Sequence, residues 1–287
     1  MVFIIGNDSA APPIVEPASL PCGVADADPQ SDPAPARVHT PPTPGLDITL
    51  VHEDERFVVI SKPAGMLSVP GRGEDKQDCA RVRVQERYPD ATGSMTCHRL
   101  DMDTSGLLVM GLDREAHRKL SSQFEKRRVR KWYTALCLGR LPADPLPGET
   151  DGDERRGVVE LPQRVDWPNR PLQIVDAEHG KPGKTTWILR GEEDWETPDG
   201  RTVGASRFEL RPFTGRTHQL RLHCAHATVR SDDGHAGEPG GLGLPIIGDR
   251  LYGDASLAPR LLLHAERLGF WHPFNGEWMK FEDPAPF

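Results

Sequence analysis

Short segments with β-strand character, separated by turns, constrain the fold of this chain more than any other feature. The stretch ITLVHEDERFVVISKP, at 48–63, predicts two strands around an acidic turn. Further strands are predicted over 107–112, 131–139, 158–161, 185–190, 207–211 and 262–271. Helices are predicted over 75–88, over 114–127 with Asp113 as N-cap, and from near Thr217. Because strands come in runs with few helices between them, we expect an α+β fold with a largely antiparallel sheet.

Composition divides the chain into a tail and a folded body. Residues 1–47 are rich in Pro, Ala and Asp and nearly free of aromatic residues, so they cannot bury enough apolar surface to offset their ordering entropy. We expect this tail to be disordered and residues 48–287 to form the functional domain. Inside that domain, the Gly-rich segment 231–244 is expected to be a mobile loop.

Charge and cysteine content narrow the class of protein. No apolar stretch approaches the roughly 18 residues of a membrane span, and five scattered cysteines favour reduced thiols in the cytoplasm. The net charge of −8 argues at first against nucleic acid, but residues 1–56 alone hold nine acidic and two basic residues. Residues 113–131 hold eight basic and three acidic residues, a local patch that suits a phosphate backbone. A solvated helix face is the alternative for that segment.

A polar loop before a predicted buried strand is the first candidate site. It reads His98-Arg99-Leu100-Asp101 and continues with Thr104-Ser105-Gly106. Loops at strand ends often carry catalytic groups, and this one combines an acid, a cation and hydroxyl groups. On the residues alone, a surface salt bridge with a turn is the competing interpretation.

The segment TGRTHQLRLH, at 214–223, is the second candidate. Gly215 permits a tight turn, Thr217 is the expected helix cap, and Arg221 shares a helix face with Thr217 and His218. A metal site at His218, His223 and His226 is disfavoured because the spacing has no carboxylate partner.

Patterns for nucleotide and cofactor binding are missing. The segment GKPGKT, at 180–185, resembles a nucleotide loop, but Glu178 stands where a Walker A motif needs Gly. Dinucleotide-binding and hydrolase patterns are missing as well. We therefore expect no cofactor and no metal.

Six motifs in order resemble the RluA family of RNA pseudouridine synthases. They are SKPAGMLSVPG (61–71), HRLDMDTSGLLV (98–109), KWYTALCLG (131–139), RPFTGRTHQLRLH (211–223), PIIGDRLYG (245–253) and PRLLLHAERLGFWHP (259–273). The segments DWPNRP (166–171) and GKPGKT resemble the branch that acts on both 23S rRNA and the tRNA anticodon arm. The resemblance implies a mixed, bent sheet with a central active-site cleft, RNA as the partner and no obligate protein partner.

The same resemblance assigns roles to individual residues. It implies Asp101 as the catalytic carboxylate, Tyr133 as the active-site tyrosine and Arg221 as the basic partner of Asp101. Residues implied to bind the RNA are His98, Arg99, Thr104, Arg127, Arg128, Lys131, Arg216 and His218. The chain departs from the family in the inserted segment 231–244 and in Leu244, where a His is usual. No S4-type RNA-binding module is evident before Ile48.

The implied reaction suits a carboxylate. Breaking the bond between uracil N1 and ribose C1′ is a glycosidic cleavage, in which a carboxylate acts as a nucleophile at C1′ or as a base at C2′. Both routes stay open at this point. The alternatives for the whole protein are an rRNA-only synthase of the same family, an RNA-binding protein without catalysis, and a nucleosidase using a carboxylate pair.

Overall fold

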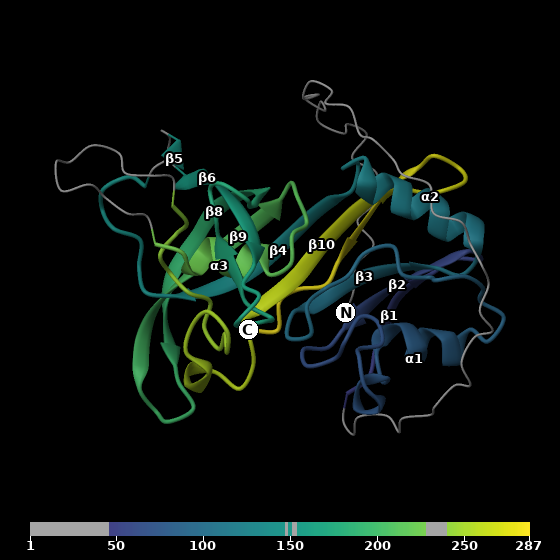
Figure 1. The fold of residues 1–287 in the computed structure, drawn as a ribbon, viewed down its shortest axis with the longest axis horizontal. Helices are drawn as coiled ribbons and strands as arrows, with labels where there is room; N and C mark the ends of the chain where they lie inside the picture. Colours follow the sequence, from purple (N-terminus) through teal and green to yellow (C-terminus); the bar gives the residue numbers. More distant parts are fainter. Residues whose placement is uncertain (1–45, 147–148, 151–153, 228–239) are drawn as a thin grey trace.

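One mixed, mostly antiparallel sheet organises the computed structural model, which describes residues 46–146, 149–150, 154–227 and 240–287 (Figure 1). The strand order is β1-β2-β3-β10-β4-β9-β8-β6-β5, with β11 beside β10 and β7 beside β6. Only the pair β3–β10 is parallel among these strands. The predicted fold class is thereby confirmed.

The strands are β1 (Thr49–Glu53), β2 (Phe57–Lys62), β3 (Ser105–Gly111), β4 (Arg130–Leu138), β5 (Glu149–Thr150), β6 (Arg156–Val165), β7 (Gln173–Val175), β8 (Lys181–Glu196), β9 (Thr202–Pro212), β10 (Leu263–Trp271) and β11 (Trp278–Glu282). The α-helices are α1 (Ala80–Arg87), α2 (Arg114–Glu125) and α3 (Gln219–Ala225), and short 3-10 turns occur at Glu74–Lys76 and Ala255–Leu257. Among these described helices, none is long and apolar enough to cross a membrane.

Strands β1, β2 and β3 form one half of the molecule, in which helix α1 packs on one face of the sheet and helix α2 on the other. Alternate residues of β2 enter different cores: Val58 and Ile60 pack with α1, whereas Phe57 and Val59 pack on the side of α2. Because both faces of this strand are buried, its sequence is a continuous apolar run rather than an alternating one.

Helix α2 begins where its sequence predicts. The side chain of Asp113 accepts hydrogen bonds from the backbone N–H groups of Glu115 (2.8 Å) and Ala116 (2.9 Å). The Arg56 guanidinium also binds Asp113 at 2.8 Å and, with those N–H groups, lowers the pKa of the carboxyl to about 2. The cap therefore ties the start of α2 to the turn between β1 and β2.

The other half contains β4, β9, β8 and β6 around a core that includes Trp187, Phe208 and Leu261. Strands β8 and β9 are longer than predicted, because their outer ends pair through polar residues that carry little apolar pattern. Ion pairs such as Arg140–Glu192 (2.9 Å) and Arg207–Glu193 (2.6 Å) hold this part of the hairpin. Strands β5, β7 and β11 were not predicted at all.

The start of α3 differs from the prediction. Thr217 does not cap the helix; the N-cap position belongs to His218, which has a left-handed φ of 55° and makes no side-chain cap. Gln219 closes the turn instead, because its Oε1 accepts from Thr214 Oγ1 (2.7 Å) and from Arg216 N (3.1 Å). The prediction that Thr217 caps α3 was wrong, because the helix begins one residue later than that cap requires. The turn before the helix is closed by the side chain of Gln219.

The segments that were predicted to be a disordered tail and a mobile loop lie largely outside the described residues. Of the predicted tail, residues 1–45 lie outside them. Its last two residues are ordered: Leu46 packs against the core, and Asp47 pairs with Arg83 at 3.4 Å. Positions 231–239 of the Gly-rich segment lie there too. Its end differs from the expected mobile loop, because Leu242 is buried and its N–H donates to His223 O at 2.9 Å.

Candidate active site

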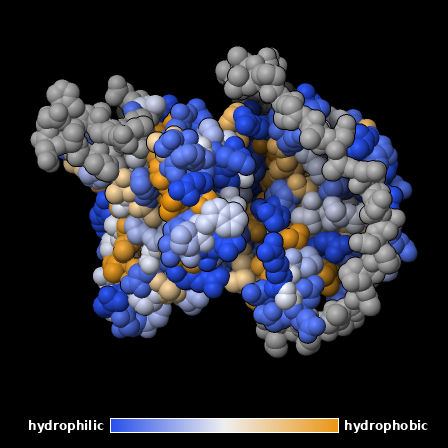
Figure 2. Space-filling model, viewed as in Figure 1, coloured by the Kyte–Doolittle hydropathy of each residue, from blue (hydrophilic) through white to orange (hydrophobic). Residues whose placement is uncertain are grey.

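A cleft of about 620 Å3 lies between the two halves of the sheet, and the surface is hollowed there in Figure 2. Its walls come mainly from segments 67–69, 98–104, 124–133 and 212–220. The two motifs singled out in the sequence thus meet in space, with β4 between them. This is the central cleft that the family resemblance implied.

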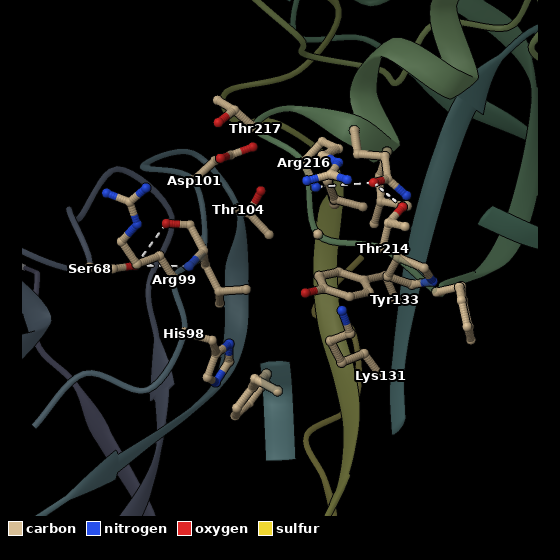
Figure 3. A pocket seen from close by; sticks show the side chains of 18 of the residues that line it. Ser68, His98, Arg99, Asp101, Thr104, Lys131, Tyr133, Thr214, Arg216 and Thr217 are labelled. Carbon is tan, nitrogen blue, oxygen red and sulfur yellow. Dashed lines mark hydrogen bonds between the residues drawn. The ribbon is translucent and has the colours of Figure 1, made fainter. Parts of the chain in front are cut away.

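The loop that carries Asp101 is held in place by hydrogen bonds to its backbone from Ser68 and Gly65. Ser68 Oγ donates to Leu100 O (2.7 Å) and accepts from Leu100 N (3.0 Å), as the dashed lines of Figure 3 show. The N–H of Gly65 donates to Met102 O at 2.9 Å. The carboxylate therefore stands on a fixed loop, which suits a group that must meet a reacting atom.

Lys62 is a buried cation beneath this loop, and the sequence analysis did not single it out. Its Nζ donates to the carbonyls of Pro63 (2.9 Å), Met66 (2.7 Å) and Met102 (3.1 Å). Burial lowers the pKa of Lys62 to about 7, while the negative charges of Asp101 and Asp103 oppose that shift. A lysine that ends a strand with a continuous apolar run, at 57–60, was the available signal, because a buried lysine must find partners.

Asp101 and Tyr133 lie on opposite walls of the cleft (Figure 3). Burial raises the pKa of Tyr133 well above its ordinary value, and the charge of Asp101 adds to the shift. The phenol therefore stays protonated across the physiological range. Lys131 lies two residues away on the same face of β4, and burial lowers its pKa to about 8.

Arg221 makes its ion pair with Asp249 rather than with Asp101. Both side chains are buried, and Arg221 Nε donates to Asp249 Oδ2 at 2.8 Å. The guanidinium also lies over the ring of Tyr252, 5.4 Å from its centroid. Asp101 acts on Arg221 at longer range, as one of the charges that raise its pKa. Sequence reasoning missed Asp249, for which the buried context of PIIGD was the only signal.

The two histidines assigned to RNA binding have structural contacts. His98 Nε2 accepts from Val109 N at 3.2 Å, and its ring stacks on Phe124 at 4.3 Å. Burial and the charge of Lys131 lower the pKa of His98 to about 3, so this ring is neutral. His218 Nδ1 meets the hydroxyl of Tyr252 at 3.0 Å.

Of the residues assigned to RNA binding or to the support of Asp101, some line the cleft and others do not. Those that line the cleft are His98, Arg99, Thr104, Arg127, Lys131 and Arg216. Those outside the lining are Arg128, His218 and Arg221. In Figure 3 the Arg99 side chain extends toward Ser68 and away from Tyr133. Within the described ranges, no group of three or more His, Cys, Asp or Glu side chains is placed to hold a metal ion.

A family model described as RNA pseudouridylate synthase matches residues 56–226, which include the Asp101 loop, Tyr133 and Arg221. The chain belongs to the RNA pseudouridylate synthase family. The predicted enzyme class is confirmed: this synthase converts uridine in RNA to pseudouridine.

Several relatives of this synthase are similar over most of their length. A protein of Pasteurella multocida named dual-specificity RNA pseudouridine synthase RluA is 42% identical over 253 residues, which are 87% of this chain and 98% of the relative. The Escherichia coli K12 protein of the same name is 40% identical over 243 residues, covering 84% and 94%. Among solved structures, human RNA pseudouridylate synthase domain containing 1 aligns with a TM-score of 0.62 at 26% identity, covering 86% of this chain and 87% of that one.

Proposed function

We propose that this synthase modifies a uridine in the anticodon stem-loop of tRNA and a uridine in a similar hairpin of 23S rRNA, with Asp101 as the catalytic carboxylate. The observation that carries the proposal is the placement of Asp101 and Tyr133 on opposite walls of one cleft, with the buried side chains of Lys62 and Arg221 close enough to feel the charge of Asp101. The relatives named dual-specificity, which align over nearly their whole length, support the assignment of two RNA substrates.

The reaction begins when the target uridine leaves its stack and enters the cleft. A base in a hairpin loop is already partly unstacked, so flipping it costs less than flipping one from a duplex. Tyr133 offers its ring for stacking against the uracil, because β4 presents this side chain to the cleft. The hairpin loop therefore suits this cleft better than a duplex does.

The carboxylate of Asp101 then breaks the bond between N1 and C1′, either by attack at C1′ or by removal of the C2′ proton. The base turns and C5 bonds to C1′; in the first route C5 displaces the carboxylate from C1′, and in the second the proton returns to C2′. The C5 proton then leaves, and N1 takes up a proton. No electron is gained or lost overall. The charge of Asp101 acts on both Lys62 and Arg221, where it favours the positively charged form of each side chain.

Basic side chains beside the cleft supply the proposed contacts to phosphates. Arg127 lines the cleft, and Arg128 is exposed next to it, at the end of α2. Arg216 lies on the other wall, where its Nε donates to Pro182 O at 3.1 Å. A compact footprint of this kind suits one hairpin, and residues 48–287 then form a single catalytic domain that works in the cytoplasm, where both RNAs occur.

The proposal is tested with purified protein and two transcripts, an isolated anticodon stem-loop and protein-free 23S rRNA. Pseudouridine is mapped by mass spectrometry in each RNA. We expect one modified loop uridine in each. Modification of the 23S rRNA alone would overturn the tRNA half of the proposal, and modification of the stem-loop alone would overturn the rRNA half.

A further inference from the structure

Phe213 is an exposed aromatic residue at the cleft, and the proposed mechanism does not use it. The residue follows the end of β9 and is 43% exposed, yet it belongs to the cleft lining together with Asp101 and Tyr133. Single exposed apolar residues are common on protein surfaces, so exposure alone indicates nothing. Two further observations set Phe213 apart.

The backbone at Phe213 is held firmly by β8. Phe213 N donates to Lys184 O at 3.0 Å, and Lys184 N donates to Thr214 Oγ1 at 2.8 Å. Gln219 Nε2 also donates to Lys184 O at 3.0 Å. The segment GKPGKT, whose resemblance to a nucleotide loop failed, therefore positions the turn that carries Phe213. An aromatic ring on such a fixed turn loses little conformational entropy when it binds a ligand.

A cation from the opposite half of the molecule lies over the same ring. The guanidinium of Arg127 is 4.9 Å from the centroid of the Phe213 ring, and both residues line the cleft. Arg127 follows α2 with a left-handed φ of 55°, while its N–H donates to Phe124 O at 3.1 Å. The pair therefore brings a flat apolar ring and a phosphate-binding cation together across the cleft, the combination that proteins use to bind single-stranded nucleic acid.

We propose that Phe213 is a stacking platform for the base next to the target uridine, with Arg127 binding the phosphate between the two nucleotides. This inference rests on the proposed function. Tyr133 is half-buried on the wall opposite Asp101 and serves the reacting base, whereas Phe213 is more exposed and serves a neighbouring base. Every base has an aromatic face, so this contact positions the RNA without selecting one sequence.

The test compares Phe213→Ala, Phe213→Leu and Phe213→Trp on the stem-loop substrate. Stacking on one base is worth about tenfold or more in affinity, so we expect Phe213→Ala and Phe213→Leu to lose roughly tenfold in kcat/KM, mainly through KM. Phe213→Trp keeps the aromatic face and should retain activity. Leucine separates stacking from simple apolar burial, because it is apolar without a ring. Equal activity of the leucine variant and the wild type would overturn the inference.

A spectroscopic measurement reports the stacking directly. 2-Aminopurine is placed on the 5′ or the 3′ side of the target uridine, and its fluorescence is followed on binding to the Asp101→Asn protein. We expect quenching at one of the two positions, and its loss in Asp101→Asn/Phe213→Leu. Quenching at neither position, or quenching that persists in the double variant, would contradict the platform.

The matched control is Phe274→Leu. Phe274 also lies under a cation, with Arg56 3.8 Å from its ring centroid, but it does not line the cleft. We expect unchanged kcat/KM and unchanged quenching in this variant. Turnover by the wild-type protein tests the proposed function separately: an active wild type with an unaffected Phe213→Leu refutes the platform alone, whereas an inactive wild type refutes the function.

Discussion

At the scale of single residues, the proposed chemistry depends on the carboxylate of Asp101. We expect Asp101→Asn to lower pseudouridine formation by more than about a hundredfold, because losing a group that reacts covalently or as a base costs orders of magnitude. RNA affinity should change little, since phosphate contacts supply most of it. Single-turnover assays and filter binding with one transcript measure both. Substantial activity in Asp101→Asn would remove the carboxylate from the mechanism.

The buried Lys62 predicts a dependence of stability on pH. Its folded pKa, about 7, lies below the ordinary value of 10.5. Between these values the unfolded chain binds more protons than the native protein, so the free energy of unfolding rises with pH, by up to about 1.4 kcal/mol per pH unit. We expect Lys62→Met to remove this component between pH 7 and 10. Urea unfolding at several pH values checks it, and identical slopes in the two proteins would show that Lys62 does not titrate there.

Residue-level reasoning from sequence pointed to Asp101 and Tyr133 but not to Lys62 or Asp249. The polar motif and the strand period alone left a salt bridge and a core position as the competing interpretations, and only the family resemblance of the two motifs assigned Asp101 and Tyr133 their roles. Lys62 and Asp249 act through contacts with residues distant in sequence, such as Met102 and Arg221. No local pattern contains those contacts.

At the scale of elements, the buried pair of Arg221 and Asp249 joins α3 to the turn at 249–252. Removing one partner of a buried ion pair leaves an uncompensated charge and costs about 3–5 kcal/mol, whereas removing both is often tolerated. We expect Arg221→Met to be strongly destabilised and Arg221→Met/Asp249→Asn to recover much of the loss. Asparagine keeps an acceptor for the N–H groups of Leu251 and Tyr252, which Asp249 Oδ1 binds at 2.8 and 3.1 Å.

Activity of that double variant separates two roles of Arg221. If the charge of Arg221 also acts on Asp101, the folded double variant should have a kcat well below that of the wild type. Full activity in a stable double variant would show that Arg221 is only a structural partner of Asp249. Thermal denaturation gives the stability of each variant, and the RNA assay on the same preparations gives its kcat.

Elements with a continuous apolar run or a strong apolar period were predictable, and the polar ones were not. Strands β2, β3 and β4 and helix α2 follow from burial and from the Asp113 cap. The outer parts of β8 and β9 depend on ion pairs, across the hairpin between Arg207 and Glu193 and from Arg140 beyond β4 to Glu192, and such polar residues give no apolar period. The cap of α3 was mistaken because the helix begins at Gln219, so the N-cap position falls on His218 and Thr217 lies one residue too early.

At the scale of the whole molecule, the basic surface at the end of α2 should govern RNA affinity. We expect Arg127→Ala/Arg128→Ala to weaken binding across different RNA sequences and to reduce the slope of log K against log salt, by roughly 0.7 for each single-strand phosphate that is no longer neutralised. Binding titrations from low to moderate salt measure the slope. An unchanged slope would show that the RNA phosphates bind elsewhere on the protein.

The acidic N-terminal region predicts a second global effect. Deleting residues 1–45 removes acidic charge that repels RNA, so we expect kcat/KM within a few-fold of the full chain. Steady-state assays of both proteins at equal salt decide this. A tenfold loss, worth about 1.4 kcal/mol, would assign this region a part in binding or folding.

The position of β10 in the sheet bears on how the protein is made. Among the described strands, this one is synthesised after all others except β11, yet it lies between β3 and β4 and pairs with each. Until it leaves the ribosome, β3 and β4 each present an unpaired edge, and such edges invite association with other chains. Asp101 precedes one edge and Tyr133 lies on the other, so the nascent chain does not bring the two walls of the proposed catalytic centre together until β10 has been synthesised.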